Sequence, residues 1–193
     1  MRAPFLFGRD CRGIARLRRV ITRQLTRDEI DLLHRIDRRE YIANIYRLEA
    51  GELVLEAHDF DVPGWPPGHE ESTIPRALAA LDRGGKAWAA LDGDLVAGAA
   101  VVDVKLVGAS KDLIQLEWLH VSRDYRRSGL GSMFIDKACA MVREEGAAGL
   151  YISATPSENT VNFYRGRGAT LVAEPDPELF ALEPEDIHLE LRI

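Results

Sequence analysis

The chain has 193 residues, of which 46% are apolar and 29% charged, and its formal net charge is −6. This length is enough for one well-buried domain and too short for two comfortable ones. No apolar run is long enough for a transmembrane helix, two cysteines do not make a disulfide framework, and the five histidines lack metal-binding spacing. We therefore expect a soluble, cytoplasmic protein with no metal site and no membrane contact.

The charge is unevenly distributed along the chain. Residues 1–23 contain seven arginines and a single acidic residue, so that the remainder carries a net charge of −12. We interpret residues 1–18 as a basic N-terminal arm, either disordered or a start-site extension, and residues 19–193 as one domain. An arm that contacts nucleic acid or a membrane is the minority alternative. The acidic body argues against a nucleic-acid partner, and it fits either a solvated surface or a cationic substrate.

The first half of the chain predicts a strand, a helix, and two strand pairs separated by a second helix. Ile30, Leu33 and Ile36 recur at helical spacing, and two glycines end the second helix. In chain order the expected elements are a strand at 20–26, a helix at 27–37, two strands within 41–57 that meet at 49–51, a proline-rich loop at 61–68, a helix at 71–85 and a hairpin at 86–104.

The second half of the chain predicts strands that alternate with helices. In chain order these are a strand at 112–121, a helix at 129–146, a short buried strand at 149–155, a helix that Ser157 caps and that ends near Gly166 or Gly168, and strands at 169–174 and 186–193 joined by a proline-rich connection. Antiparallel hairpins followed by a strand–helix–strand unit indicate the α/β class, with a mixed sheet and helices on both faces.

One turn has the composition of an anion-binding site. Residues 120–134, HVSRDYRRSGLGSMF, run from the end of an apolar strand through arginines and glycines into a helix, whose first N–H groups favour an anion. A Rossmann fingerprint needs a third glycine where Phe134 stands, and a Walker A loop needs Lys-Ser or Lys-Thr where Ser132 and Met133 stand. Neither of these phosphate-binding motifs is present.

The remaining motif, RRSGLG at residues 126–131, resembles the pyrophosphate motif of the GNAT superfamily of N-acetyltransferases, Arg/Gln-x-x-Gly-x-Gly/Ala at a helix start. The strand before it ends in Leu119-x-Val121, which is similar to the end of that family's central strand. The family's second signature is matched by an asparagine, a Phe-Tyr pair and a glycine at Asn159, Phe163, Tyr164 and Gly168. The likeness covers roughly residues 86–193 and implies the GNAT-like fold, a mostly antiparallel mixed sheet with a splayed central strand pair.

The resemblance implies that the chain uses acetyl-CoA as its acyl donor. Main-chain amides of the turn would face the pyrophosphate, two arginine side chains would add charge-assisted bonds, and the edge of the central strand would bind the pantetheine. The residues expected to bind acetyl-CoA are Leu119, His120, Val121, Arg126, Arg127, Ser128, Gly129, Leu130, Gly131, Ser132, Asn159 and Tyr164.

The same resemblance implies transfer of the acetyl group to an amine, which attacks only when it is neutral. Glu117 is the best-placed general base, because burial in an apolar strand raises the pKa of a carboxyl; a structural role for it and a proton relay through water remain alternatives. His120 is a rival base, although strand alternation puts it on the opposite face unless a bulge intervenes. Tyr164 matches the family's tyrosine that protonates the leaving thiolate.

The segments that would form the acceptor side mix carboxylates with aromatic rings, which suits an amine on an apolar stem or is ordinary surface and core. These residues are Asp37, Glu40, Tyr41, Tyr46, Asp59, Asp61 and Trp65. We therefore predict an N-acetyltransferase that acts on a small-molecule amine by direct transfer in a ternary complex, with a homodimer left open. The alternatives are a non-catalytic acyl-CoA-binding or sensing domain, and a protein acetyltransferase acting on lysine or an N-terminal amine.

Overall fold

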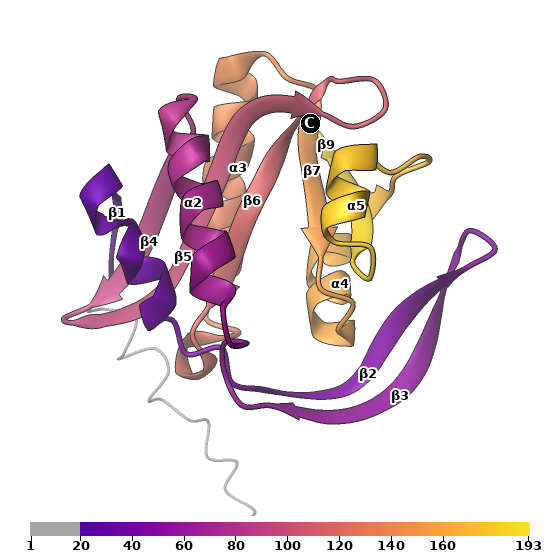
Figure 1. Cartoon of the computed structure of the whole chain (residues 1–193), viewed down its shortest axis with the longest axis horizontal. Helices are drawn as coiled ribbons and strands as arrows, with labels where there is room; N and C mark the ends of the chain where they lie inside the picture. The colour runs from indigo at the N-terminus through magenta and orange to yellow at the C-terminus, as the bar shows by residue number, and fades with distance from the viewer. Residues whose placement is uncertain (1–19) are drawn as a thin grey trace, which may run out of the picture.

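The computed structural model describes residues 20–193, and a seven-stranded sheet forms their centre (Figure 1). Its strands lie in the order β1-β4-β5-β6-β7-β9-β8, and the β6–β7 pair is parallel whereas the other neighbours are antiparallel. The strands are β1 (Ile21–Gln24), β4 (Lys86–Asp92), β5 (Leu95–Val107), β6 (Leu113–Val121), β7 (Gly149–Ala154), β8 (Thr170–Leu171) and β9 (Ile187–Arg192). The expected mixed, mostly antiparallel sheet is confirmed.

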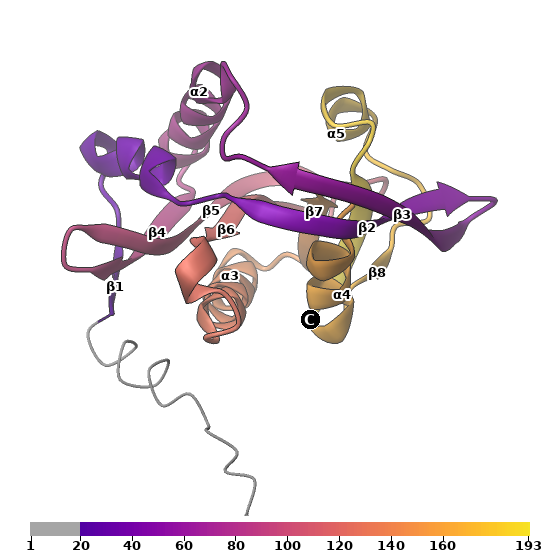
Figure 2. The ribbon, with the colours of Figure 1, turned by 90° about the horizontal axis from the view of Figure 1, so that it is seen from below.

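Helices cover both faces of this sheet, as Figure 2 shows from below. One face carries the 3₁₀ helix η1 and helices α2 and α5, and the other carries α3 and α4. The bounds of these helices are Arg27–Arg35 for η1, His69–Asp82 for α2, Leu130–Glu145 for α3, Glu158–Gly166 for α4 and Pro177–Leu182 for α5. None of the described helices is long and apolar enough to cross a membrane.

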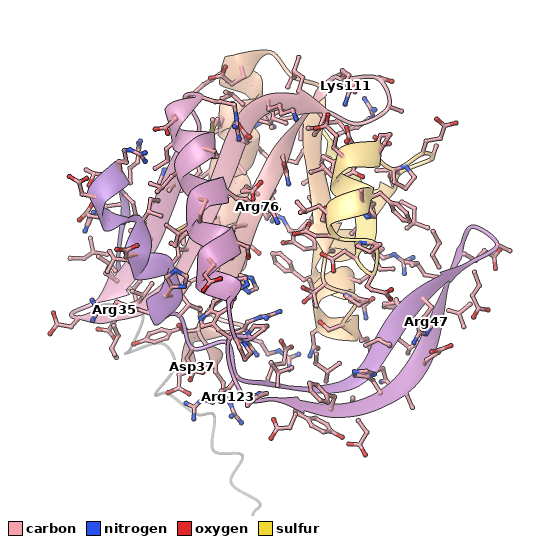
Figure 3. The ribbon with its side chains drawn as sticks, in the orientation of Figure 1. Arg35, Asp37, Arg47, Arg76, Lys111 and Arg123 are labelled. Atoms are coloured by element: carbon pink, nitrogen blue, oxygen red, sulfur yellow. The ribbon has the colours of Figure 1, made fainter. Side chains whose placement is uncertain are left out.

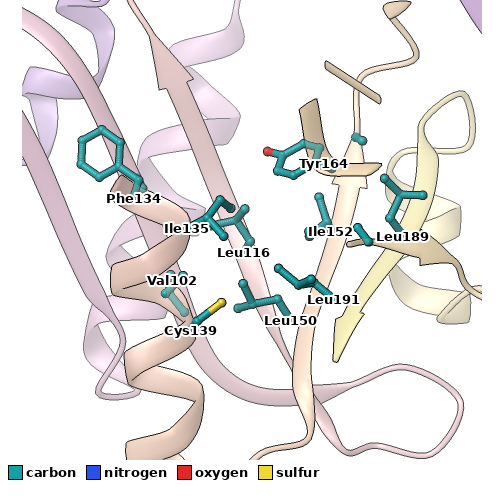
Figure 4. Packing of buried hydrophobic residues seen from close by; sticks show 14 of the residues in the cluster. Val102, Leu116, Phe134, Ile135, Cys139, Leu150, Ile152, Tyr164, Leu189 and Leu191 are labelled. Carbon is teal, nitrogen blue, oxygen red and sulfur yellow. The ribbon is translucent and has the colours of Figure 1, made fainter. Parts of the chain in front are cut away.

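Each face of the sheet buries its own apolar core. Phe134, Ile135 and Val142 of α3 pack with β6 and β7 on one face, and α2 and η1 pack against β4 and β5 on the other. Figure 4 shows the first core, in which Leu116 and Ile152 face each other from β6 and β7. Cys139 of α3 lies buried in this core as a free cysteine.

A two-stranded hairpin, β2 (Glu40–Glu49) and β3 (Glu52–Val62), stands apart from the main sheet. It crosses the end of the molecule toward which β6 and β7 run and projects beyond α4 (Figure 1). Its first strand is fixed to the body because the Tyr46 N–H donates to the carbonyl of Pro156 at 2.7 Å and the Asn44 amide donates to Glu158 at 2.8 Å. The hairpin is therefore hydrogen-bonded to the body along the β2 edge.

The expected elements are present, with three differences. The helix over residues 27–37 is a 3₁₀ helix, which explains the spacing of Ile30, Leu33 and Ile36, because three residues per turn place every third side chain on one line. The proline-rich connection contains α5, a short helix that the sequence did not predict. The strand expected at 169–174 is reduced to two residues. The arm expected at residues 1–18 lies outside the described residues.

Candidate active site

The two central strands are paired over only part of their length. Parallel pairing joins Leu113–Gln115 of β6 to Gly149–Tyr151 of β7, and it stops there although both strands continue. Beyond this point β6 keeps its partner β5, and β7 keeps its partner β9. The strands therefore separate, and the main chain of β6 from about Leu116 onward presents an edge without a β7 partner.

A β-bulge lies where the strands separate. Across β5, Val102 pairs with Leu116 and Val101 pairs with Trp118, so that Glu117 is the extra residue on β6. Glu117 bonds to α2 and Trp118 packs in the core beneath α2, which places two successive side chains on one face. The bulge thereby directs the carboxylate of Glu117 to the side of α2 and α5.

The bulge also changes the position of His120. Its ring packs against Trp118 at 4.6 Å and Trp65 at 5.1 Å, on the α2 face that Glu117 occupies. Simple alternation predicted the opposite face; the intervening bulge is the physical reason for the difference. Burial lowers the pKa of His120 to about 3, with Arg38 adding to the effect, so this imidazole is neutral at physiological pH.

The pairing of β6 with β5 determines which main-chain groups face the open edge. The Ser122 N–H donates to Ala97 of β5, and in an antiparallel ladder every second residue repeats this orientation, so His120 pairs with Ala99. The N–H and C=O groups of Leu119 and Val121 therefore point away from β5, toward the gap. The main chain of His120, which we expected to share that role, faces β5 instead.

The turn before α3 leaves a run of N–H groups without acceptors among residues 20–193. The helix has no side-chain cap, and its first internal hydrogen bond runs from the Met133 N–H to Gly129, so the amides of Leu130, Gly131 and Ser132 find none within the helix. Gly129 has a φ of 92°, and a Cβ built on it would meet nothing within 4 Å. This open, positively polarised helix start is suited to an anion.

The other residues of the motif have different surroundings. Arg127 is exposed and has a φ of 59°. The guanidinium of Arg126 instead binds the structure itself: it donates to the Val121 carbonyl at 3.2 Å and lies 3.5 Å from Glu40. Gly131 makes room for a neighbour, because a Cβ there would lie 3.1 Å from the Phe163 ring of α4.

Glu117 is the buried end of a partly buried ion-pair chain. Its carboxylate accepts from Arg76 Nε at 2.5 Å, and Arg76 Nη1 donates to Glu183 at 2.8 Å. Figure 3 shows Arg76 reaching from α2 toward α5. The side chain of Glu117 is 9% exposed, and burial raises its pKa while the Arg76 charge acts in the opposite sense. The net effect is a carboxyl that takes up a proton more readily than a solvated one.

Tyr164 lies on the far side of the gap, in α4. Its side chain is buried, and its hydroxyl is directed from α4 toward the strand that carries Leu116 (Figure 4). Burial raises the pKa of the phenol, and the nearby charge of Asp186 adds to this effect. The hydroxyl makes no hydrogen bond within residues 20–193 that would occupy its proton. Tyr164 is therefore protonated at neutral pH.

Two buried polar atoms near the separating strands also lack partners. The indole N–H of Trp118 on β6 and the hydroxyl of Ser153 on β7 have no hydrogen-bond acceptor or donor within the described part of the chain. Buried groups of this kind are uncommon in native proteins, and they are usually satisfied by ordered water or a ligand. Their presence fits a site that something polar enters.

The residues expected on the acceptor side are divided between several places. Trp65 stacks between His69 and Trp118 and donates to the Ile36 carbonyl at 2.9 Å. The others are held on the hairpin and its approach: Asp37 pairs with Arg39, Glu40 pairs with Arg126, Tyr41 bonds Asp59, Tyr46 bonds Asn162, and Asp61 is exposed. Asn159, expected to contact the cofactor, is exposed and lies 3.5 Å from Glu40, while Ser157 caps α4 as predicted.

A cavity of about 1100 Å³ lies between the hairpin and the last two strands. Apolar walls come from Ile42, Ile45 and Phe60 of the hairpin and from Phe180 of α5. Asp186 lies in the wall and is close enough to Tyr164 to raise the pKa of its phenol. The cavity does not include Glu117 or Tyr164 themselves, so Asp186 links it to the gap between the strands.

Comparisons with known proteins show the family of the chain. The family model "Acetyltransferase (GNAT) family" matches residues 42–169, which is more than half of the chain. This chain belongs to the GNAT acetyltransferase family. It is an acetyl-CoA-dependent acetyltransferase, and its cosubstrate is acetyl-CoA. No curated protein sequence matches the chain.

Solved structures share the fold at low sequence identity. Nourseothricin acetyltransferase is 17% identical with a TM-score of 0.66, covering 90% of this chain and 98% of its own. A Bacillus anthracis str. Ames protein, provisionally named a streptothricin acetyltransferase and solved with acetyl coenzyme A, is 18% identical with a TM-score of 0.58, covering 90% and 97%. A PaiA N-acetyltransferase of Thermoplasma acidophilum, solved with coenzyme A, is 12% identical with a TM-score of 0.56, covering 90% and 99%.

Several residues of this GNAT acetyltransferase site were not predicted from the sequence. Arg76, Glu183 and Asp186 surround Glu117 and Tyr164, yet they come from a helix and a connection distant in the chain. Asp186 has its pKa raised to about 6, mainly by burial and then by Glu183. Arg38 also lies half-buried over the Trp65 ring, at 5.1 Å from its centroid. No local signal marks these residues, because only the tertiary fold brings them to the site.

The open helix start predicts a specific loss on substitution. Gly129→Val places a side chain in the space that an anion would occupy, and we expect acetyl-CoA affinity to fall about tenfold or more, which is at least about 1.4 kcal/mol. Gly146→Val is the matched control, since Gly146 ends the same helix with a φ of 69° and equally open surroundings. Both variants lose about 1–2 kcal/mol of unfolding free energy through backbone strain. Calorimetric titration checks the result, and equal affinities for the two variants would contradict it.

Proposed function

We propose that this enzyme transfers the acetyl group of acetyl-CoA to a primary amine of a small molecule, directly within a ternary complex. The observation that carries the proposal is the placement of a buried carboxylate, Glu117, and a buried protonated phenol, Tyr164, on the two sides of one gap. A transfer of this kind needs a proton removed from the amine and another delivered to the departing sulfur.

In this proposal the turn and the strand edge hold acetyl-CoA. The free amides of Leu130, Gly131 and Ser132 bind the pyrophosphate, with the exposed Arg127 adjacent. The outward-facing main-chain groups of Leu119 and Val121 bind the pantetheine arm. The Val121 carbonyl already accepts a hydrogen bond from Arg126. The Val121 N–H faces the gap and would stabilise the negative charge that develops on the thioester oxygen.

Glu117 is the proposed general base. An alkylammonium has a pKa of about 10.4, so the acceptor amine must lose a proton before it attacks the acyl carbon. Burial of Glu117 improves its basicity, and Arg76 keeps the carboxylate oriented through a direct hydrogen bond. His120 shares the face of Glu117, but its lowered pKa makes its imidazole the weaker base.

Tyr164 is the proposed general acid. Its phenol is held protonated by burial, and the hydroxyl is directed into the gap. When the carbon–sulfur bond breaks, the electron pair leaves with sulfur, and the phenol proton neutralises the resulting thiolate. A transient phenolate at this position regains its proton from solvent, or from the amine by way of Glu117.

The cavity supports a small molecule as the acceptor. Its volume of about 1100 Å³ slightly exceeds the usual range for small-molecule sites, which is roughly 300–1,000 Å³, so a small molecule has room to bind. Apolar walls with Asp186, Glu185 and Glu49 suit an amine on an apolar stem. The names of two similar structures, acetyltransferases for nourseothricin and streptothricin, point in the same direction. We also place the enzyme in the cytoplasm, where a free thiol such as Cys139 persists.

A panel of amines tests the acceptor class. With acetyl-CoA present, we expect coenzyme A release to require a small primary amine, and we expect initial velocities to give intersecting lines for the two substrates, as a ternary complex requires. Mass spectrometry of the product identifies the acetylated nitrogen. If protein lysines or N-termini were acetylated and small amines were not, the result would favour a protein acetyltransferase instead. Parallel lines would indicate an acetylated enzyme and contradict direct transfer.

Replacing the general base should remove a pH dependence. The wild-type kcat should decrease as pH falls through the pKa of Glu117, which burial holds above the usual carboxyl range, because only the ionised form accepts a proton. Glu117→Gln should lower kcat by roughly 10²–10⁴-fold and abolish that acid limb. Glu144→Gln, which removes a surface carboxylate of α3 paired with Lys86, is the control. A near wild-type kcat in the Glu117→Gln enzyme would exclude Glu117 as the base.

Removing the phenol hydroxyl should affect chemistry and leave binding intact. We expect Tyr164→Phe to lower kcat by about 10²-fold while the Kd for acetyl-CoA stays within about twofold, since only a transition-state interaction is lost. Tyr125→Phe removes a hydroxyl that bonds Asp92 of β4 at 2.7 Å and serves as the control. Unaltered kcat in the Tyr164→Phe enzyme would reduce Tyr164 to a packing residue.

A further inference from the structure

A buried hydrogen-bond network lies beneath the segment that carries Glu183 and Asp186. The Tyr151 hydroxyl and His188 Nδ1 are 2.9 Å apart, and His188 Nε2 lies 3.2 Å from the carbonyl oxygen of Glu183. The main-chain N–H of Asp176 donates to the Tyr151 hydroxyl at 3.0 Å. Tyr151 and His188 are 0% and 5% exposed, so the two bonds to the Tyr151 hydroxyl are buried, whereas the bond to the Glu183 carbonyl is partly buried.

The network determines the protonation of its members. Because the Tyr151 oxygen accepts from the Asp176 N–H, its own proton is free to be donated to His188 Nδ1. The Glu183 carbonyl can only accept, so His188 Nε2 carries the hydrogen. His188 is thus a neutral imidazole protonated at Nε2, and burial lowers its pKa in agreement with this.

The two ends of α5 are fixed by this network. At the start, the Asp176 carboxylate accepts from the main chain of Glu178 at 3.0 Å and Gly108 at 2.9 Å, and from Lys111 at 2.7 Å. At the end, His188 holds the carbonyl of Glu183, the residue that caps the helix. A helix of six residues has little stability of its own, so these bonds determine where Glu183 lies.

We propose that His188 is a positioning residue for acetyl transfer, acting on Glu117 through Glu183 and Arg76. This inference rests on the proposed function. The path runs from the imidazole to the Glu183 main chain, then from the Glu183 carboxylate to Arg76 Nη1 at 2.8 Å, and from Arg76 Nε to Glu117 at 2.5 Å. His188 lines the cavity, but its hydrogen bonds within residues 20–193 go to Tyr151 and Glu183 and not to Glu117 or Tyr164. It fixes the second carboxylate that shares the Arg76 guanidinium with the proposed base.

The charged groups that face this path come from several elements. Glu117 faces Arg76 of α2, Glu183 after α5 and Asp103 of β5. His188 faces the charges of Glu183 and Asp176, and the Phe180 and Tyr151 rings lie 5.6 Å and 5.8 Å from its own. A displacement of Arg76 and Glu183 would therefore change the pKa of the Glu117 carboxyl.

Isosteric variants of His188 separate its two hydrogen bonds. His188→Phe removes both, His188→Gln retains a donor near the Nε2 position, and His188→Asn retains a polar group only near Nδ1. We expect His188→Phe and His188→Asn to lower kcat by about tenfold or more with the KM for acetyl-CoA unchanged, since small misplacements in a catalytic group are costly. His188→Gln should restore most of kcat. Lys105→Ala is the control, because it removes the exposed ion pair of α5 with β5.

A double-mutant cycle distinguishes the path from general loosening. If His188 acts through the Glu183 side chain, His188→Phe in a Glu183→Gln background has no further effect on kcat. Additive losses would overturn the proposal, and so would a kcat of the His188→Phe enzyme within twofold of wild type. Should the His188→Phe protein fail to fold, as circular dichroism would reveal, the His188→Asn protein takes its place in the cycle.

Nuclear magnetic resonance tests the same path without an amine substrate. The pKa of Glu117, followed through its ¹³C-labelled carboxyl, should move in the same direction in His188→Phe as in Glu183→Gln. An unmoved Glu117 pKa in the His188→Phe protein would overturn the inference even in an active enzyme. If the wild type acetylates no amine while the Glu117 pKa does move, the proposed function fails and the coupling of His188 to Glu117 stands.

Discussion

The early end of the β6–β7 pairing is the constraint on which the rest of the site depends. Each strand keeps its antiparallel partner, and Gly149 shows how tightly this is enforced on β7, since a Cβ there would lie 2.3 Å from the Leu191 carbonyl of β9. Because β7 stays paired with β9 and β6 stays paired with β5, the parallel ladder between β6 and β7 retains only three residue pairs. The gap that results exposes main-chain groups of β6 to a ligand while the cores on both faces remain closed.

The bulge at Glu117 gives this gap its chemistry. A regular strand would place Glu117 and Trp118 on opposite faces; the extra residue places both toward α2, where Arg76 meets the carboxylate. The ion pair and the burial then act on the pKa of Glu117 in opposite senses. A base that was buried but unpaired would take up a proton at neutral pH, and one that was paired but solvated would be weak, so the site depends on both effects together.

The sequence was informative where the determinants are local. The glycines and free amides around Gly129 belong to a helix start, and both the hairpins and α3 follow from turn residues and periodicity. It was uninformative where partners are distant: 41 residues separate Arg76 from Glu117 and 107 separate it from Glu183. The bulge was equally invisible, because it appears only in the register between β5 and β6. The face of His120 could therefore be predicted only conditionally, as opposite to Glu117 unless a bulge intervenes.

The two halves of the site therefore differ in how they are encoded. The side proposed to bind acetyl-CoA is built from one contiguous motif and a strand edge, both of which lie within residues 42–169 that the family model matches. The acceptor side is assembled from a hairpin docked along one edge, from α2, and from the connection that carries Asp186. Hairpin side chains such as Leu48 and Phe60 are about half exposed, so packing constrains this wall less than the core. Substitutions there would alter the shape and charge of the cavity without disturbing the gap between β6 and β7, so the proposed pair of Glu117 and Tyr164 could serve different amines.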